Sequence, residues 1–501
     1  MDPHLRLTVT AADLAPARDA LLAMAGRPRP DRSRFTATYY DTGDHALHRR
    51  ALALEVRRSG RQFVQTVIHD PGGNLVAGQW VDPIRGARPD PAAPHAQSAI
   101  GTDLAAADLH PVFAVRIARS SFRLSPLEDT EIEVAIDLAE IRAVGGATET
   151  LHIIDLTLKR GEGAALWDVA LRLLELITCR IEPLCVAGRG FRLLVPEEKP
   201  VAQNGHATAL EADMTFDAAL QQIGRSLIAS LLRNETQALA GSPEGVHQMR
   251  IAVRRLRSLL SAVRAMLPQD HFAWANGVLR WLGSALGPVR NLDVFDDALL
   301  KPVSGALKGE RDLARLATAA RRRRKVAHER ACEAIRSARY TASLMRLARW
   351  FEARAWRDQP VSEKSARLVE PLSDVAPALL RRLYRKARRR AKNFRDLGPP
   401  QRHKLRIALK QLRYATEFLD GIYDEDKVER FISRVRPLQD DLGYASDVRS
   451  AKALVAELGN GHAVLERAGG IVIGWHDRGL AEAETRMLKH VRRFRDDKPF
   501  W

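Results

Sequence analysis

The sequence GVHQMRIAVRRLRSLL at residues 245–260 decides the fold of the second half of the chain, because the chain repeats it. The second copy reads QRHKLRIALKQLRYATE at residues 401–417, and His403 stands 156 residues after His247. The same offset relates Arg250 to Arg406, Arg254 to Lys410, Arg257 to Arg413, Leu282 to Leu438, Leu286 to Leu442 and Gly287 to Gly443. A match sustained over about forty residues indicates an internal duplication.

Each copy predicts an amphipathic helix with a row of cations. At about 100° per residue, the basic residues of a copy fall within about 80° of its histidine, and the leucines cluster on the opposite face. Arginine grips phosphate oxygens through paired hydrogen bonds and stays charged, so a straight row of this kind suits a linear polyanion. A charge run on a helix is usually a solvated face, but the duplication of the histidine together with the cations favours a binding role. For each histidine, an interhelical hydrogen bond and a ligand contact both stay open.

The paired H-x-x-R-x-x-x-(R/K)-x-L-R signatures resemble the CHAD family, the conserved-histidine α-helical domain, over residues 207–501. The resemblance implies two pseudo-symmetric four-helix bundles around a basic central cavity that binds inorganic polyphosphate. We also include Arg290, which is expected in a loop after Gly287, and a basic stripe within residues 381–392. The predicted polyphosphate-binding residues are His247, Arg250, Arg254, Arg257, Arg290, Arg381, Arg385, Arg388, Arg389, Lys392, His403, Arg406, Lys410 and Arg413.

The basic stripe has its own rationale. Residues 381–392 hold eight basic residues in twelve positions, and Arg381, Arg385, Arg388 and Lys392 share one helix face. Like charges this dense destabilise an isolated helix, and a bound polyanion relieves that repulsion. A solvated face is the alternative. The run Arg321–Lys325 points all round a helix, so only part of it can face one ligand.

Composition agrees with a polyanionic partner. The net charge is +18, which favours polyphosphate, nucleic acid or an anionic surface. Aromatic residues make up only 6%, which is few for a protein that stacks bases. The three cysteines lack metal-ligand spacing and fit a reducing cytoplasm. The start MDPHLRLTVT has no apolar signal region, and no apolar run reaches the length of a membrane span.

The first 195 residues differ in pattern from the rest of the chain. Apolar and polar residues alternate there over short segments, which predicts strands. Helices are expected at 11–25 and 164–177, and a hairpin loop at Pro71–Asn74. Many short strands with few helices predict an antiparallel sheet closed into a barrel. The predicted strands are 4–10, 36–40, 53–57, 63–68, 78–81, 113–119, 121–124, 131–137 and 152–158.

This region resembles the CYTH family of triphosphate tunnel enzymes. The matching pieces are Tyr40-Asp41-Thr42, Gln65-Thr66, Trp80 and Arg189-Gly190-Phe191. The resemblance implies an eight-stranded tunnel, which in active members binds a triphosphate with basic residues and a divalent metal with glutamates. Cleavage of such an anhydride needs the metal to neutralise developing charge and position water.

The family's catalytic set is largely missing here. His4, Arg6 and Thr8 stand where the family has an opening Glu-x-Glu-x-Lys, and the remaining replacements are Glu55, Ile68, Ala77, Gln79, Val81, Ile153, Asp155, Thr157 and Val186. Arg57, Arg116, Glu131, Glu133, Asp137 and Arg189 survive. A tunnel metal needs several oxygen ligands, so these changes remove the site or turn it into an anion holder. We expect no catalytic residues, no resident metal and no cofactor, with Mg or Mn relevant only if the tunnel is active.

The sequence therefore predicts an α+β chain with three parts: an antiparallel β-barrel or tunnel at residues 1–195, a linker at 196–210, and an all-α domain at 211–501. The all-α domain divides into two pseudo-symmetric four-helix bundles, about 211–365 and 366–501. Its expected helices are 216–240, 246–266, 272–286, 292–300, 311–336, 341–354, 371–392, 402–419, 427–438, 446–458 and 474–494. Ser242 and Pro243 are expected to start the first signature helix as N-cap and first-turn residue.

These patterns favour a cytoplasmic polyphosphate-binding protein whose tunnel has lost triphosphatase activity. Two alternatives stay open: a metal-dependent tunnel triphosphatase or polyphosphatase assisted by the helical domain, and a nucleic-acid-binding protein. Recruitment to polyphosphate or storage granules is a further possibility that the resemblance allows.

Overall fold

The computed structural model describes residues 3–69, 78–101, 108–194, 210–496 and 498–501. The chain divides into two compact units. The sheet unit comprises Met1–Gln203, Ile228–Asn234 and Ser337–Ala355, and the helical unit comprises Asn204–Leu227, Glu235–Arg336 and Trp356–Trp501. The predicted hairpin loop Pro71–Asn74 and nearly all of the predicted linker lie outside the described residues.

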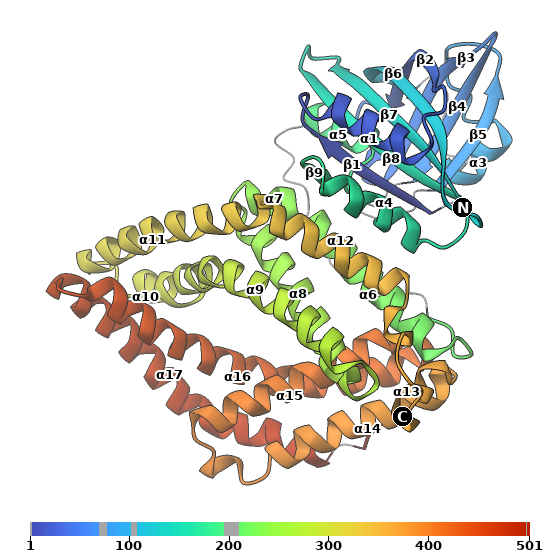
Figure 1. Cartoon of the computed structure of the whole chain (residues 1–501). Coiled ribbons are helices and arrows are strands. Elements are labelled where there is room, and N and C mark those ends of the chain that lie inside the picture. Colours follow the sequence, from blue (N-terminus) through green and yellow to red (C-terminus); the bar gives the residue numbers. More distant parts are fainter. Residues whose placement is uncertain (1–2, 70–77, 102–107, 195–209, 497) are drawn as a thin grey trace. The chain divides into compact units, whose positions relative to one another are not determined.

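The sheet unit is built on one antiparallel sheet with the order β5-β4-β3-β2-β6-β7-β8-β1-β9 (Figure 1). The sheet is therefore antiparallel as predicted, and its short strand β9 was not among the predicted strands. Among the described residues its end strands β5 and β9 do not pair with each other, so the predicted barrel is not closed by hydrogen bonds. The strands are β1 (His4–Val9), β2 (Asp31–Asp41), β3 (Leu52–Ser59), β4 (Gln62–His69), β5 (Gly78–Ile84), β6 (His110–Leu127), β7 (Thr130–Ala143), β8 (Thr148–Arg160) and β9 (Cys179–Ile181).

The strands form because apolar and polar residues alternate along them. In β7, Ile132 and Val134 are fully buried, whereas Glu131 and Glu133 are only partly buried. Two predicted strands, 113–119 and 121–124, are one strand, β6, because the extended pattern continues through Ser120 and Ser121 while β2 and β7 pair along its length.

Short helices cover parts of the sheet. They are α1 (Leu14–Met24), α2 (Ala46–Arg49), α3 (Pro94–Ile100), α4 (Ala164–Leu174) and α5 (Val186–Leu194). One apolar core joins Phe191 of α5 to Tyr39 and Phe113 of the sheet, and a second joins α2 and α3 to β3 and β4. The compact sheet unit also contains α12 (Ala338–Glu352) and the last turns of α6.

The helical unit consists of long helices that follow the duplication (Figure 1). Their bounds are α6 (Phe216–Arg233), α7 (Glu235–Leu239), α8 (Pro243–Val263), α9 (Gln269–Val294), α10 (Lys301–Ala306), α11 (Arg311–Arg336), α13 (Glu363–Ala366), α14 (Leu372–Arg390), α15 (Pro399–Phe418), α16 (Glu425–Gly459) and α17 (Ala463–Asp496). The first residues of α6 and α14, of α8 and α15, and of α9 and α16 are each 156 residues apart. The repeat therefore extends well beyond the two signature helices.

An apolar junction joins the two copies. A small cavity of about 20 Å³ is lined by α6, α8, α14 and α15, and four pairs of its lining residues are 156 residues apart in the sequence. Phe216 corresponds to Leu372, which is itself fully buried, while Ile223 corresponds to Leu379 and Leu259 to Ala415. Equivalent positions of both copies thus pack against one another, as a duplicated bundle requires.

Two predicted breaks in the helices are wrong. The predicted segments 272–286 and 292–300 are joined, because α9 continues through Gly287-Pro288 to Val294 and a π-helical turn, Phe295–Leu300, follows. Proline removes one backbone hydrogen bond, but Leu286, Val289 and Leu292 remain buried along one face of the helix. Arg290 therefore lies in a helix rather than in a loop. Likewise 427–438 and 446–458 form the single helix α16.

Candidate functional site

The two signature helices, α8 and α15, pack against each other, so the two copies of the signature share one location. The start of α8 follows the prediction, because the Ser242 hydroxyl accepts a hydrogen bond from the Gly245 amide and Pro243 occupies the first turn. Arg254 reaches across the pair and donates from Nε to the Tyr414 hydroxyl at 2.8 Å. A cation of the first copy is thereby fixed against the helix that carries the cations of the second.

A cluster of cations from both copies forms at this packing. We call Arg250, Arg254, Arg290, Arg406 and Lys410 the cation cluster; each is partly buried. Burial, followed by repulsion from Arg254 and Arg290, lowers the pKa of Arg250 from 12.5 to about 10. Burial, followed by repulsion from Arg254 and Arg406, lowers the pKa of Lys410 from 10.5 to about 6. Cations that suppress each other's charge in this way create a strong local demand for an anion.

One carboxylate, Asp447 of α16, lies among these cations. Burial raises the pKa of Asp447 above its ordinary value, although Arg406, Lys410, Arg290 and Arg254 oppose this rise. Asp440 also interacts electrostatically with Lys410, and Asp297 with Arg290. The basic side chains of the cluster still outnumber these carboxylates. Asp293, which the sequence pairs with Asp447 after a two-residue slip, instead binds Arg324 Nε at 2.5 Å and has a structural role.

The central arginines of the two copies have matched supports. Arg250 Nη1 donates to the Gly283 carbonyl at 3.4 Å, and a Cβ at Gly287 would lie 2.9 Å from that same Nη1. Arg406 Nη1 donates to Ser446 Oγ at 3.4 Å, and a Cβ at Gly443 would lie 3.9 Å from Arg406 Nε. The repeated glycines therefore leave room for the repeated arginines to lie along α9 and α16.

The remaining signature residues lie around the cluster. His247 is half-buried, and burial followed by repulsion from Arg290 lowers its pKa to about 4, so it is a neutral imidazole at neutral pH. His403 is exposed and neighbours Arg406 and Arg449. Arg413 hydrogen-bonds Gln439 and Glu417, and Arg257 is exposed and donates to Asn276 Oδ1 at 3.3 Å. His247 is coupled electrostatically to Arg290, Arg254 and Arg250, and Arg413 to Lys410, so these two lie beside the cluster. Ligand contact by these four residues stays a prediction.

Within the described residues, no contact joins the predicted basic stripe to the cation cluster. Arg381, Arg385, Arg388, Arg389 and Lys392 are all exposed, and Arg388 lies over the Tyr384 ring at 5.6 Å. Of the Arg321–Lys325 run, Arg324 is engaged by Asp293 and by the Gly241 carbonyl. A contact between the stripe and the ligand therefore stays a prediction.

Sequence reasoning missed three residues that shape the cluster. Tyr414 accepts from Arg254 and lies under the Arg413 guanidinium, 4.9 Å from its ring centre. Arg255 pairs with Glu417 at 3.6 Å, and Ser446 receives Arg406. None of the three is repeated at the other copy, where Ser258, Gln411 and Arg290 stand. The duplication that revealed the other residues therefore carried no signal for these.

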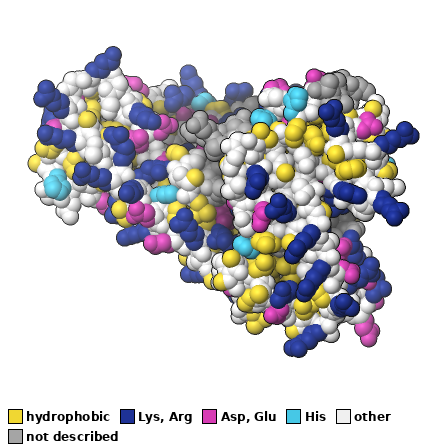
Figure 2. Space-filling view, turned by 90° about the horizontal axis from the view of Figure 1, so that it is seen from above, with side chains coloured by type: hydrophobic (Ala, Val, Ile, Leu, Met, Phe, Trp, Pro, Cys, Tyr) yellow, Lys and Arg dark blue, Asp and Glu magenta, His cyan; other side chains and the backbone are white. Residues whose placement is uncertain are grey.

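Surface charge alone does not locate the site. Figure 2 shows lysine and arginine side chains spread over the face in view, with acidic and hydrophobic side chains between them. The cation cluster differs from this surface because its members are partly buried and perturb one another's pKa.

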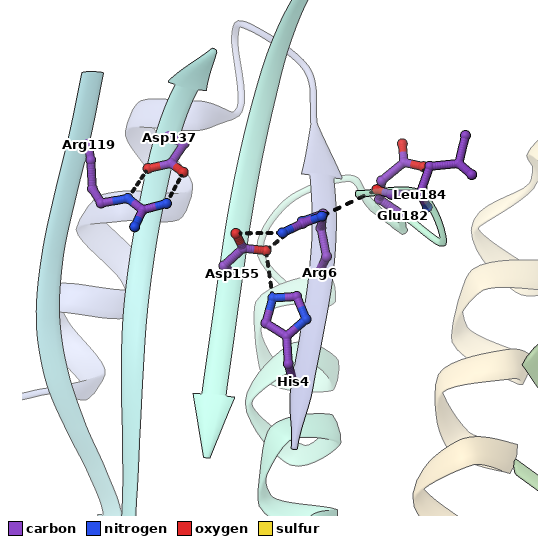
Figure 3. Close-up of polar contacts among 7 residues, drawn as sticks. All are labelled: His4, Arg6, Arg119, Asp137, Asp155, Glu182 and Leu184. Atoms are coloured by element: carbon purple, nitrogen blue, oxygen red, sulfur yellow. Dashed lines mark hydrogen bonds and ion pairs between the residues drawn. The ribbon is translucent and has the colours of Figure 1, made fainter. Parts of the chain in front are cut away.

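The sheet unit holds a second candidate site, a cavity of about 570 Å³ lined by residues from eight strands, β1 to β8. Two of its carboxylates, Asp155 and Asp137, are already bound by cations (Figure 3). Asp155 accepts from Arg6 Nε at 2.7 Å, from Arg6 Nη2 at 3.1 Å and from His4 Nε2 at 2.9 Å. Asp137 is held in the same two-pronged way by Arg119, at 2.9 and 2.7 Å.

These pairs do not fit the divalent metal of tunnel enzymes. Burial would raise the pKa of Asp155, but Arg6 and His4 outweigh burial and hold it well below its usual value. A metal would have to displace both cations to reach the carboxylate oxygens. In the part of the chain that the structure describes, no group of three or more His, Cys, Asp or Glu side chains is arranged to hold a metal ion.

The residues that survive from the tunnel pattern are mostly engaged elsewhere. Arg116 is exposed and faces Glu140 at 3.5 Å, so the inward-facing arginine of β6 is Arg119 rather than Arg116. Arg189 binds Glu149 at 2.7 Å, and Glu133 binds Lys159 at 3.1 Å. The sequence alignment was therefore out of register on β6.

The pieces that carried the tunnel resemblance support the fold. Asp41 is fully buried and accepts from the amides of Leu47 and His48, which fixes the start of α2. Gln65 exchanges two hydrogen bonds with the backbone of Asp90. A Cβ at Gly190 would lie 2.3 Å from the Phe113 ring, so only glycine lets α5 approach the sheet this closely.

The helical unit thus defines a duplicated bundle protein with a shared cation cluster at the contact of its two copies. Residues 222–456 match the family model of the CHAD domain, so this part of the chain is a CHAD domain, as the signatures predicted. The CHAD domain of the plant Ricinus communis has a similar fold, with a TM-score of 0.52 and 24% identity over 59% of this chain and 97% of that chain.

Two further comparisons cover only part of the protein. An uncharacterised protein of Mycobacterium tuberculosis (strain CDC 1551 / Oshkosh) is 30% identical over 214 residues, which is 40% of this chain and 39% of that protein. The match thus spans about two fifths of the length of the curated relative. A putative adenylyl cyclase from Hippeastrum gives a TM-score of 0.29 at 13% identity, over 41% of this chain and 100% of that one. Within the described residues, we find no helix whose length and hydropathy would let it cross a membrane.

Proposed function

We propose that this protein binds inorganic polyphosphate through the cation cluster of its CHAD domain. The observation that supports the proposal most is the convergence of Arg250, Arg254, Arg406 and Lys410 from two copies of one signature on α8 and α15. Polyphosphate carries about one negative charge per phosphate and has no bases or other groups that need separate contacts. It therefore matches a surface of regularly spaced cations.

The energetics favour a ligand that enters as an anion. The basic residues of the cluster are partly buried and repel each other, so burial first and this repulsion second lower the pKa values of Arg250 and Lys410. Bound phosphates would raise both pKa values, which would return the charge to Lys410 at neutral pH, and would form charge-assisted hydrogen bonds with both residues. Binding should therefore be coupled to proton uptake and should weaken with salt.

The same geometry argues against nucleic acid as the main ligand. Proteins that bind single strands stack bases on accessible aromatic rings. Tyr414, the aromatic residue held by the cluster, is 2% exposed, and Arg254 and Arg413 already lie against it. Phosphate groups can be bound here, whereas a base would find no open ring on Tyr414.

The test is titration of the full chain with long-chain polyphosphate. Neutral substitutions at Arg250, Arg254, Arg406 and Lys410, each to Gln, are expected to weaken binding more than about a hundredfold, because each lost charge-assisted hydrogen bond is worth about 1.5–3 kcal/mol. The matched control exchanges four exposed basic residues of α11 for Gln: Arg321, Arg322, Lys325 and Arg330. Equal losses in both variants would mean that only net charge matters, and would overturn the site.

Competition separates the alternatives. At equal charge concentration, polyphosphate is expected to displace single-stranded RNA from the protein, whereas a nucleic-acid-binding protein would retain RNA. We also propose that the sheet unit has no triphosphatase activity. Phosphate release from tripolyphosphate that requires Mg or Mn and is abolished by Glu133→Ala would contradict this second part while leaving the polyphosphate site intact.

A further inference from the structure

The cavity of the sheet unit is electrically balanced, unlike the cation cluster. Four basic residues line it, Arg6, Arg57, Arg119 and Lys159, and four acids face them, Glu55, Asp137, Asp155 and Glu182. A triphosphate would bring several negative charges into a space without net positive charge. It would also have to compete with carboxylates that already hold the arginines.

Most of these charges are paired with one another. Arg6 is bound by Asp155 and Arg119 by Asp137, each through two hydrogen bonds (Figure 3). Glu182 has Arg189 at 3.6 Å and also accepts from the Leu184 amide at 3.1 Å. These groups are therefore poor contacts for an added ligand.

Arg57 is the exception. Its nearest acidic atom is Glu55 Oε1 at 3.9 Å, while Glu55 Oε2 is taken by the Tyr39 hydroxyl at 2.7 Å. Arg57 Nε is buried and has no hydrogen-bond partner among the described residues. The guanidinium lies over the Phe35 ring at 5.4 Å, and the side chain is 37% exposed although it lines the cavity. One guanidinium with unused donors calls for one negative charge.

The surroundings of Arg57 indicate the rest of the ligand. The backbone register places Thr66 opposite Glu55, and Thr66 lines the same cavity with a hydroxyl that can donate. Much of the remaining wall is apolar and includes Phe35, Ile68, Val81, Ile117, Leu184 and Leu232. A volume of about 570 Å³ suits a small molecule, and an apolar wall with few polar groups is typical of such sites.

We propose that this cavity binds a small organic monoanion, a monocarboxylate with an apolar body, with its carboxylate on the Arg57 guanidinium and its body against the apolar wall. The carboxylate fits the planar fork of arginine. The other charges of the cavity are balanced, and only Arg57 has unused donors, so the cavity would discriminate against polyphosphate. The two units of the chain would therefore select different anions.

The experiment is calorimetric titration of the full chain with sodium hexanoate. Saturable binding is expected, and Arg57→Gln is expected to weaken it about tenfold or more through loss of a charge-assisted hydrogen bond. Arg58→Gln is the matched control. It is the next residue on β3, it is exposed and it donates to the Gly60 carbonyl at 3.1 Å, so its loss should leave hexanoate affinity unchanged. Hexylamine, the cationic counterpart of similar length, should not bind.

Several outcomes would overturn the proposal. They are no saturable binding of hexanoate, equal affinity in Arg57→Gln and the parent protein, or displacement of hexanoate by polyphosphate, which would make the cavity a polyanion site. Thermal melts show whether each variant is folded. If Arg57→Gln does not fold, Arg57→Lys keeps the charge but loses the fork, and a several-fold weaker affinity is then expected, with unchanged affinity counting against the proposal.

Discussion

Replacing Lys410 with methionine should stabilise the protein and weaken its binding of polyphosphate. Burial and the nearby arginines lower the pKa of Lys410 from 10.5 to about 6. A base with a lowered folded pKa costs stability; the full cost applies below about pH 6 and disappears as pH rises through 10.5. At pH 8 the ordinary pKa of 10.5 lies about 2.5 units above the pH, which corresponds to a cost of roughly 3 kcal/mol in the free energy of unfolding. A neutral side chain of similar length would recover most of this cost.

Urea unfolding at pH 8 and at pH 6 measures this effect. The midpoint of Lys410→Met should exceed that of the parent protein at both values, and the difference should be larger at pH 6. The matched control is Lys404→Met on the same helix, where the lysine is exposed and little change is expected. In calorimetry at pH 8, the parent should take up a proton when polyphosphate binds, and Lys410→Met should take up less. A destabilised Lys410→Met, or equal proton uptake, would refute the reasoning.

Three other perturbations give distinct results. Gly287→Ala places a Cβ 2.9 Å from Arg250 Nη1 and should weaken polyphosphate binding several-fold in titration. The melting temperature should not fall, because a flexible guanidinium can move and alanine favours a helix. Gly443→Ala, whose Cβ would lie 3.9 Å from Arg406 Nε, should bind polyphosphate normally. Asp155→Asn leaves Arg6 buried without its charge partner and should cost about 3 kcal/mol in urea unfolding at pH 7. Because the folded pKa of Asp155 is lowered, that difference should shrink as pH falls below about 4, and a constant difference would count against the ion pair. The slope of log affinity for polyphosphate against log salt should become shallower by about one for each cluster cation that is neutralised, by analogy with phosphate contacts to nucleic acid, and an unchanged slope would exclude that cation from the contact.

The duplication made it possible to predict the helices and the matched cations of the helical unit from the sequence. A fixed offset identified matched residues, and the structure shows that the same offset also relates the first residues of three helix pairs. The breaks predicted at residues 287–291 and 439–445, which contain Gly287-Pro288 and Gly443, are wrong. Buried leucines on the same helices outweigh these helix-breaking residues. Rules that consider only the residues near a proline or glycine do not include the packing of the helix against its neighbours.

The candidate sites were only partly accessible to sequence reasoning. The repeated cations were found because they recur, whereas Tyr414 and the position of Asp447 inside the cluster depend on how α15 and α16 pack. In the sheet unit, Arg116 was chosen in place of Arg119 because a small shift in register exchanges the faces of a strand. The pairing of Asp155 with Arg6 joins β8 to β1, so no local pattern could reveal it.

The central claim is that both copies of the signature hold one polyphosphate chain, and a crystal structure of the protein with bound polyphosphate tests it most directly. The account predicts phosphate density that passes Arg250 and Arg254 of α8 and continues along Arg406 and Lys410 of α15. Density confined to the exposed stripe on α14, with the cation cluster empty, would contradict it.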